Sequence, residues 1–73
     1  MTKRDALTEA RRRWGVKGRI GLRRKIGPNR YRVGIFKTVP FPYTDIQGMG
    51  DTWEAAFADA TSRERRRIED ERE

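Results

Sequence analysis

The side chains best suited to chemistry in this sequence are its arginines and lysines, and most of them lie in its first half. Residues 1–37 contain thirteen Lys and Arg against two acids, a net charge of +11, whereas residues 38–73 have a net charge of −4. Clustered cations bind polyanions because they displace the counterions that condense on phosphates. The charge pattern therefore predicts that the N-terminal half binds a polyanion such as a nucleic acid.

Side chains for covalent or metal chemistry are scarce. The sequence contains no Cys and no His, so it lacks soft metal ligands and the usual nucleophile-base pairs. Asp45 and Asp51 flank a predicted loop, where a turn residue and a helix cap explain them without a metal ion. We therefore expect no enzyme, no metal site and no cofactor.

The length of 73 residues predicts one domain over residues 1–73. Folding at this size buries only about 60% of the unfolded surface, so the core must be small. No apolar run approaches the roughly 20 residues of a membrane span, and the absence of Cys fits an intracellular protein. We expect a cytoplasmic protein that does not associate with membranes.

A helix is expected at each end of the domain. Thr2 and Asp5 have capping-box spacing at the start of the first helix, and Gly15 is expected to end it. The apolar face of this helix contains Leu7, Ala10 and Trp14. The second helix is capped by Asp51 or Thr52, and its apolar stripe contains Trp53, Ala56, Phe57 and Ala60.

The end of the second helix has a different character. Its apolar stripe nearly vanishes beyond Thr61, so we expect residues 61–73 to form a charged, solvated helical extension. Pairs with the i,i+4 spacing that stabilises such a helix are Arg65/Glu69, Arg66/Asp70 and Arg67/Glu71.

Alternation of apolar and polar residues predicts three strands between the helices. The first strand is expected to place Ile20, Leu22 and Ile26 toward the core and Arg19, Arg23 and Lys25 outward. A turn at residues 27–30 follows, because Pro28 sets one corner and Asn29 tolerates the next. The third strand is expected around residues 44–49.

The second strand is expected to place Tyr31, Val33, Ile35 and, if it continues that far, Val39 toward the core. Arg30, Arg32, Phe36 and Thr38 then face outward, until Pro40 and Pro42 interrupt the ladder. Phe36 could stack on a base or touch a thymine methyl group, although a single exposed aromatic residue is an equal alternative.

The order of these motifs resembles the double-stranded RNA-binding domain family. The resemblance rests on Leu7-Thr8-Glu9, Gly15, Gly27-Pro28-Asn29-Arg30, Arg30-Tyr31-Arg32-Val33, Gly48-Met49-Gly50-Asp51-Thr52 and Ala56. It implies an α+β fold with α-β-β-β-α order, a three-stranded antiparallel sheet and both helices on one face. It also implies that Glu9 contacts ribose hydroxyls. The lysine cluster that begins the family's second helix is absent, because residues 53–57 read Trp-Glu-Ala-Ala-Phe.

A second resemblance is to DNA-binding domains with a three-stranded sheet, namely the plant ethylene-response-factor domain and the arm-binding domain of tyrosine recombinases. Residues 52–60 are similar to the helix that follows the sheet in the plant family. The resemblance implies that the outer face of the sheet enters the DNA major groove, where Arg can pair bidentately with guanine.

Together these patterns predict a protein that binds double-stranded nucleic acid, with DNA favoured over RNA. The expected contact residues are Arg4, Arg11, Arg12, Arg13, Lys17, Arg19, Arg23, Lys25, Arg30 and Arg32.

One alternative is that the protein binds duplex RNA through the ordinary face of the double-stranded RNA-binding domain family that it resembles. Another is a basic module that docks on an acidic protein or forms a homodimer, with the C-terminal helix mediating the contact. A basic face that only maintains solubility is the simplest alternative. By analogy, an accessory protein of a bacteriophage or mobile element fits this size.

Overall fold

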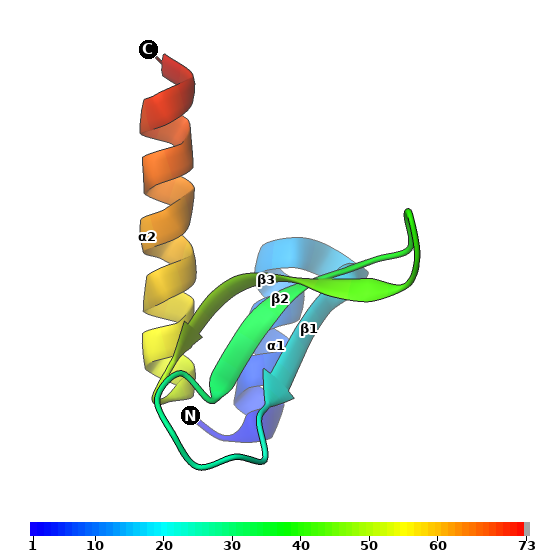
Figure 1. The fold of residues 1–73 in the computed structure, drawn as a ribbon, viewed down its shortest axis with the longest axis vertical. Coiled ribbons are helices and arrows are strands. Elements are labelled where there is room, and N and C mark those ends of the chain that lie inside the picture. Colours follow the sequence, from blue (N-terminus) through cyan, green and yellow to red (C-terminus); the bar gives the residue numbers. More distant parts are fainter. Residues whose placement is uncertain (73) are drawn as a thin grey trace.

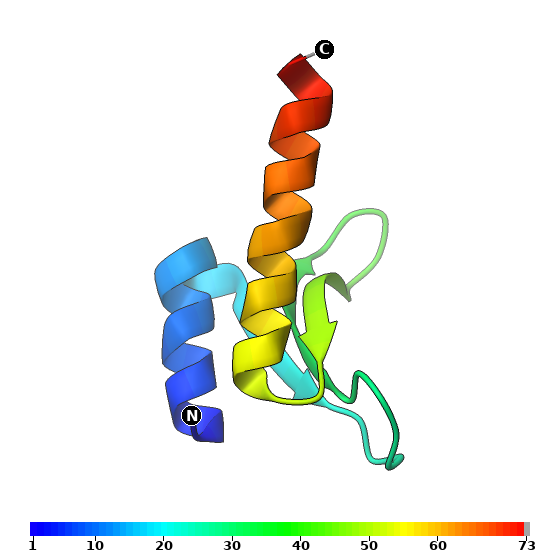
Figure 2. The ribbon, with the colours of Figure 1, turned by 90° about the vertical axis from the view of Figure 1, so that its left-hand side faces the viewer.

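Two helices lie on one face of a three-stranded antiparallel sheet (Figures 1 and 2). The computed structural model describes the backbone of residues 1–72 and the side chains of residues 1–70. The elements are α1 (Lys3–Trp14), the short 3₁₀ helix η1 (Gly15–Lys17), β1 (Gly18–Leu22), β2 (Tyr31–Lys37), β3 (Tyr43–Gly50) and α2 (Trp53–Arg72). The predicted α+β class and α-β-β-β-α order are confirmed.

The predicted ends of α1 are also confirmed. Thr2 Oγ1 accepts a hydrogen bond from the Asp5 N–H, and Asp5 Oδ2 accepts one from the Thr2 N–H, both at 3.1 Å. This capping box satisfies backbone donors that have no partner within the helix. The helix ends at Trp14, and Gly15 follows with a φ of 71°.

A small core joins both helices to β2. Its buried residues are Ala6, Ala10, Val33, Trp53, Ala56, Phe57 and Ala60. Trp14 stacks on Phe57 with ring centroids 6.2 Å apart, and Tyr31 meets Trp53 edge-on at 4.8 Å. The predicted apolar stripe of α2 is therefore confirmed at all four positions. In α1, Ala6 is buried where Leu7 was expected, and Leu7 is only half-buried.

Two glycines allow the helices to lie directly against the sheet. A Cβ atom at Gly18 would strike the backbone of Ala10 in α1, and one at Gly48 would strike the backbone of Ala56 in α2. In the strand register, Gly18 pairs with Ile35 and Gly48 pairs with Val33. Because side chains alternate along β2, both helices must cover the face that carries its odd-numbered residues.

The structure corrects the predicted limits of the first two strands. Sequence alternation continues to Ile26, but β1 ends at Leu22, and the side chain of Ile26 is 92% exposed. Val39 likewise lies beyond the end of β2 and is 78% exposed. Neither residue belongs to the core, because the chain has already left the sheet at both positions. The alternation of apolar and polar residues continues there without a strand.

The start of α2 settles which residue caps it. Thr52 Oγ1 accepts a hydrogen bond of 3.0 Å from the Ala55 N–H, whereas Asp51 Oδ1 accepts one of 2.9 Å from the Asn29 N–H. Thr52 is therefore the cap. Asp51 instead ties the β1–β2 connection to the start of α2.

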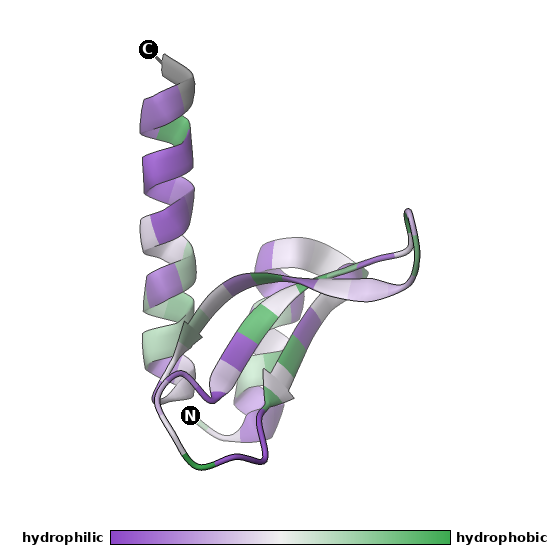
Figure 3. Cartoon of the chain, viewed as in Figure 1, coloured by the Kyte–Doolittle hydropathy of each residue, from purple (hydrophilic) through white to green (hydrophobic). Residues whose placement is uncertain are grey.

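The second half of α2 projects away from the sheet (Figure 1) and is largely hydrophilic (Figure 3). Asp59 and Arg63 form an ion pair of 3.0 Å on this helix. Among the described side chains, the predicted pairs Arg65/Glu69 and Arg66/Asp70 do not form, and Arg67/Glu71 lies outside them. Within the described residues, neither helix is long and apolar enough to span a membrane.

Candidate nucleic-acid interface

The face of the sheet opposite the helices, termed the open face, carries two of the predicted contact residues. By the strand register it consists of Arg19 and Gly21 on β1, Arg32, Gly34 and Phe36 on β2, and Thr44, Ile46 and Met49 on β3. The predicted outward orientation of Arg19, Arg32 and Phe36 is therefore confirmed. Only β1 and β2 contribute cations to this face.

Arg19 is held in place at one end of the open face. Its guanidinium donates hydrogen bonds of 3.0 Å to the carbonyl oxygens of Val16 and Gly18. It also lies over the ring of Phe36, with its central carbon 5.1 Å from the ring centroid. This cation–π contact occupies a face of Phe36. The aromatic ring thus orients Arg19, which makes a base-stacking role for Phe36 less favourable.

Arg32 lies in the middle of the open face. It pairs in register with Gly21 on β1 and with Met49 on β3, and its side chain is half-buried. Its Nε atom is buried and has no hydrogen-bond partner among the described residues. A buried donor without an acceptor lowers stability, whereas the Nη groups of Arg32 are not buried in this way and are the donors that a ligand could reach.

Four further cations, Arg23, Arg24, Lys25 and Arg30, lie in the β1–β2 connection. This connection is largely hydrophilic and lies at the other end of the open face (Figure 3). Arg23, Arg24 and Lys25 are exposed, and none of the three forms an ion pair among the described residues. The Arg23 N–H donates to the Arg30 carbonyl oxygen at 2.8 Å, and Arg30 Nε donates to the Arg23 carbonyl oxygen at 3.2 Å. The two arginines are therefore fixed beside each other.

Arg24 is an additional candidate that the sequence did not single out. Like Leu22 and Ile26, it has an even number, and the predicted first strand, which was too long, placed its even-numbered residues toward the core. Arg24 joins five predicted residues in one group on the β1–β2 hairpin. This group, the hairpin cluster, consists of Arg19, Arg23, Arg24, Lys25, Arg30 and Arg32.

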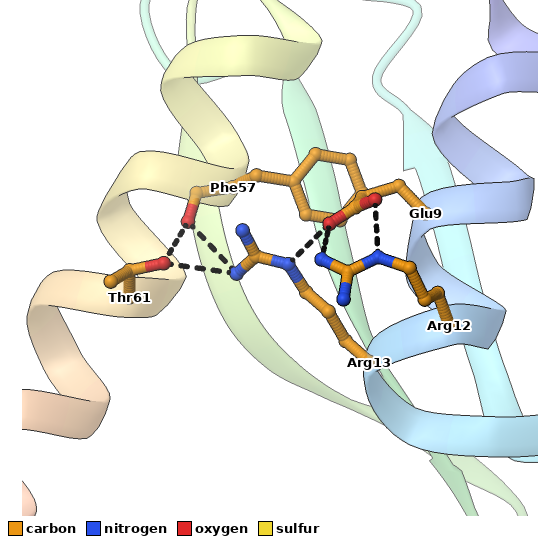
Figure 4. A network of polar contacts seen from close by, with 5 residues as sticks. All are labelled: Glu9, Arg12, Arg13, Phe57 and Thr61. Carbon is orange, nitrogen blue, oxygen red and sulfur yellow. Dashed lines mark hydrogen bonds and ion pairs between the residues drawn. The ribbon is translucent and has the colours of Figure 1, made fainter.

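Two of the predicted contacts on α1 are engaged within the protein (Figure 4). Glu9 accepts hydrogen bonds from Arg12 Nε at 3.0 Å and from Arg13 Nε at 2.9 Å. Hydrogen bonds from Arg12 and then from Arg13 lower the pKa of Glu9 to about 2. The carboxylate is thus ionised near neutral pH and offsets one of the two positive charges.

The remaining predicted contacts do not lie on the open face. Arg4 and Arg11 are exposed on α1, which packs against the opposite face of the sheet, and Lys17 is exposed in η1 at the start of β1. The ten predicted contacts are therefore divided between two sides of the molecule. Lys37, which was not predicted, forms an ion pair of 2.8 Å with Asp45.

The first turn of α2 contains no cation. Trp53 and Phe57 are buried in the core, and Glu54 pairs with the N-terminal ammonium of Met1 at 2.8 Å. Residues 38–60 contain no Lys or Arg at all. This helix end therefore lacks the side chains that would neutralise a phosphate group.

Other surface features carry less chemistry. A notch on the projecting half of α2 is lined by Arg63, Arg66, Arg67 and Asp70, all from one helix. Among the described residues, no three His, Cys, Asp or Glu side chains gather as metal ligands would.

Comparison with known proteins finds no matching family model, no matching curated protein and no matching solved structure.

Proposed function

We propose that this protein binds double-stranded nucleic acid, DNA in preference to RNA, through the hairpin cluster. The observation that carries this proposal is the gathering of six cations on one β-hairpin, none of them in an ion pair among the described residues. Unpaired cations release the most counterions when they meet phosphates. The paired cations Arg12, Arg13 and Lys37 contribute less.

The shape of the hairpin supports DNA over RNA. A two-stranded β-ribbon fits the major groove of B-form DNA, which is about 12 Å wide. The corresponding groove of A-form RNA is deep and narrow, and side chains cannot read it. The open face of the sheet carries Arg19 and Arg32, and it suits the wider major groove of B-form DNA.

The side chains expected to contact RNA are missing or engaged. The start of α2 lacks lysines, and Glu9, which the first resemblance implies at ribose hydroxyls, already binds Arg12 and Arg13. Duplex RNA bound in the manner of that family would have to share this carboxylate with both arginines. This supports the sheet-based mode that the second resemblance implies.

Fluorescence anisotropy with a labelled DNA duplex tests the proposal. Arg23→Ala, Lys25→Ala and Arg32→Ala are each expected to weaken binding several-fold and to leave far-UV circular dichroism unchanged. Arg65→Ala is the matched control, because it removes the same charge from an exposed position on the projecting half of α2. Its affinity should remain within about twofold of wild type, since a distant charge is screened beyond roughly 10 Å.

Two outcomes would favour the alternatives. Arg30 and Glu9 belong to motifs that carry the resemblance to the RNA-binding family. If the three hairpin variants bind normally while Arg30→Ala and Glu9→Ala abolish binding to duplex RNA, the RNA mode is correct. If neither duplex binds but an acidic protein does, the basic half is a protein-docking module. The same titrations, run with both duplexes, separate these cases.

A further inference from the structure

Gly21 is a glycine that the fold does not require. A Cβ atom at this position would meet no atom within 4 Å, whereas one at Gly18, Gly34 or Gly48 would strike backbone. Glycine weakens a strand, and in a strand interior it often marks the close approach of a ligand or another backbone. Since no protein atom other than those of its chain neighbours lies within 4 Å of this Cβ position, the free space on the open face is available to a ligand.

Arg32 provides an independent indication at the same place. It is the register partner of Gly21 on the neighbouring strand, and its Nε donor is buried with no acceptor among the described residues. β1 is an edge strand, because the strand order is β1-β2-β3. Because Gly21 has no side chain, no side chain at this register position of β1 lies between Arg32 and the edge of the sheet.

We propose that Gly21 and Arg32 together form a seat for one backbone phosphate of the bound duplex. Phosphates form the walls of a DNA groove, and an edge strand of a ribbon in the groove lies against one wall. Arg32 is half-buried and lies beside a position without a side chain. This arrangement suits a phosphate oxygen that approaches the surface of the sheet better than a base edge on the floor of the groove. This inference rests on the proposed function and assigns Arg32, already a member of the hairpin cluster, to a phosphate rather than to a base.

The decisive variant is Gly21→Val, which fills the seat. It should fold with an unchanged or higher melting temperature, because β-branched residues favour strands. Its affinity for duplex DNA should fall about tenfold, the effect of losing one hydrogen bond to a charged group. Gly21→Ala should show a smaller loss. Thr44→Val, on the same face but on a strand without Lys or Arg, is the control and should bind as wild type does.

Arg32→Lys tests the guanidinium separately from its charge. This variant keeps the positive charge, so the salt dependence of binding should stay the same, but the affinity should fall because the fork of N–H donors is lost. A phosphate contact must weaken binding equally for duplexes of different sequence. Unequal losses would mean that Arg32 contacts a base edge and would overturn the assignment.

Failure of this inference can be told apart from failure of the proposed function. If the wild-type protein does not bind duplex DNA, both are wrong. If wild type binds and folded Gly21→Val and Arg32→Lys bind equally well, only the phosphate seat is wrong. If Gly21→Val does not fold, Gly21→Ala and Arg32→Lys decide the question in the same assay.

Discussion

The guanidinium of Arg13 on α1 donates a hydrogen bond of 3.0 Å to Thr61 Oγ1 on α2. The same Nη1 atom reaches the Phe57 carbonyl oxygen at 3.3 Å, and the guanidinium lies over the Phe57 ring. Thr61 Oγ1 in turn donates to that carbonyl oxygen at 3.1 Å (Figure 4). An arginine from a run of three consecutive arginines therefore joins the two helices.

Arg13→Ala is expected to destabilise the protein, whereas Arg11→Ala is not. Arg13 has several polar partners and a side chain 25% exposed, so its loss should cost about 1–2 kcal/mol and lower the melting temperature by roughly 5–15 °C. Arg11, two residues away, is exposed and serves as the matched control. Thermal unfolding followed by circular dichroism measures both. Equal melting temperatures would show that the helix-joining contacts contribute nothing.

The stability of the protein should depend on Glu9 in acid. Its pKa is lowered from 4.5 to about 2 by hydrogen bonds from Arg12 and Arg13. A carboxylate whose pKa falls on folding stabilises the protein fully above its unfolded pKa, and this contribution is lost as the pH falls toward the folded value. The difference in unfolding free energy between wild type and Glu9→Gln should therefore be constant above pH 4.5 and shrink between pH 4.5 and about 2. Urea unfolding across this range measures it, and a difference independent of pH would contradict the assignment.

Asp51 is expected to act on binding in two opposing ways. Its carboxylate holds the Asn29 N–H at 2.9 Å, which positions the connection that carries Arg30, but its negative charge lies beside the hairpin cluster. Asp51→Asn keeps an acceptor oxygen and removes the charge, so it should bind duplex DNA roughly twofold more tightly at low salt. Asp51→Ala loses the acceptor as well and should bind less tightly than Asp51→Asn. Identical affinities for the two variants would show that the hydrogen bond does not affect binding.

Removal of residues 63–73 should leave duplex binding intact. This segment contains five Arg and five acids, so its loss does not change the net charge, and none of residues 63–70 belongs to the buried core. The truncated protein is expected to match wild type in anisotropy titrations. A large loss of affinity would instead favour the alternative in which the C-terminal helix mediates a homodimer or contacts a partner. Sedimentation of both forms would distinguish those two possibilities.

The sequence was most informative where the spacing of apolar residues and caps determines structure locally. The Thr2–Asp5 capping box and the α2 stripe from Trp53 to Ala60 followed directly from residue type and period. The end of β1 did not, because alternation continues past Leu22 into a connection where no helix covers Ile26. Strand limits depend on partners distant in sequence, which a local pattern does not reveal.

The candidate site shows the same division. The spacing of Glu9 and Arg13 already matched an i,i+4 ion pair. Arg13 was nevertheless predicted to contact phosphate, because the net charge of residues 1–37 is strongly positive. The bond from Arg13 to Thr61, 48 residues apart in sequence, could not be anticipated. The empty position at Gly21 became meaningful only when the register placed it beside Arg32.

The most direct test of the central claim is a salt titration of wild-type protein with duplex DNA, duplex RNA and single-stranded DNA of equal length. If all six residues of the hairpin cluster contact phosphates of B-form DNA, the logarithm of the binding constant should fall against the logarithm of salt concentration with a slope of about −5. Duplex DNA should bind most tightly at every salt concentration. A slope near zero, or tighter binding of duplex RNA, would contradict the account.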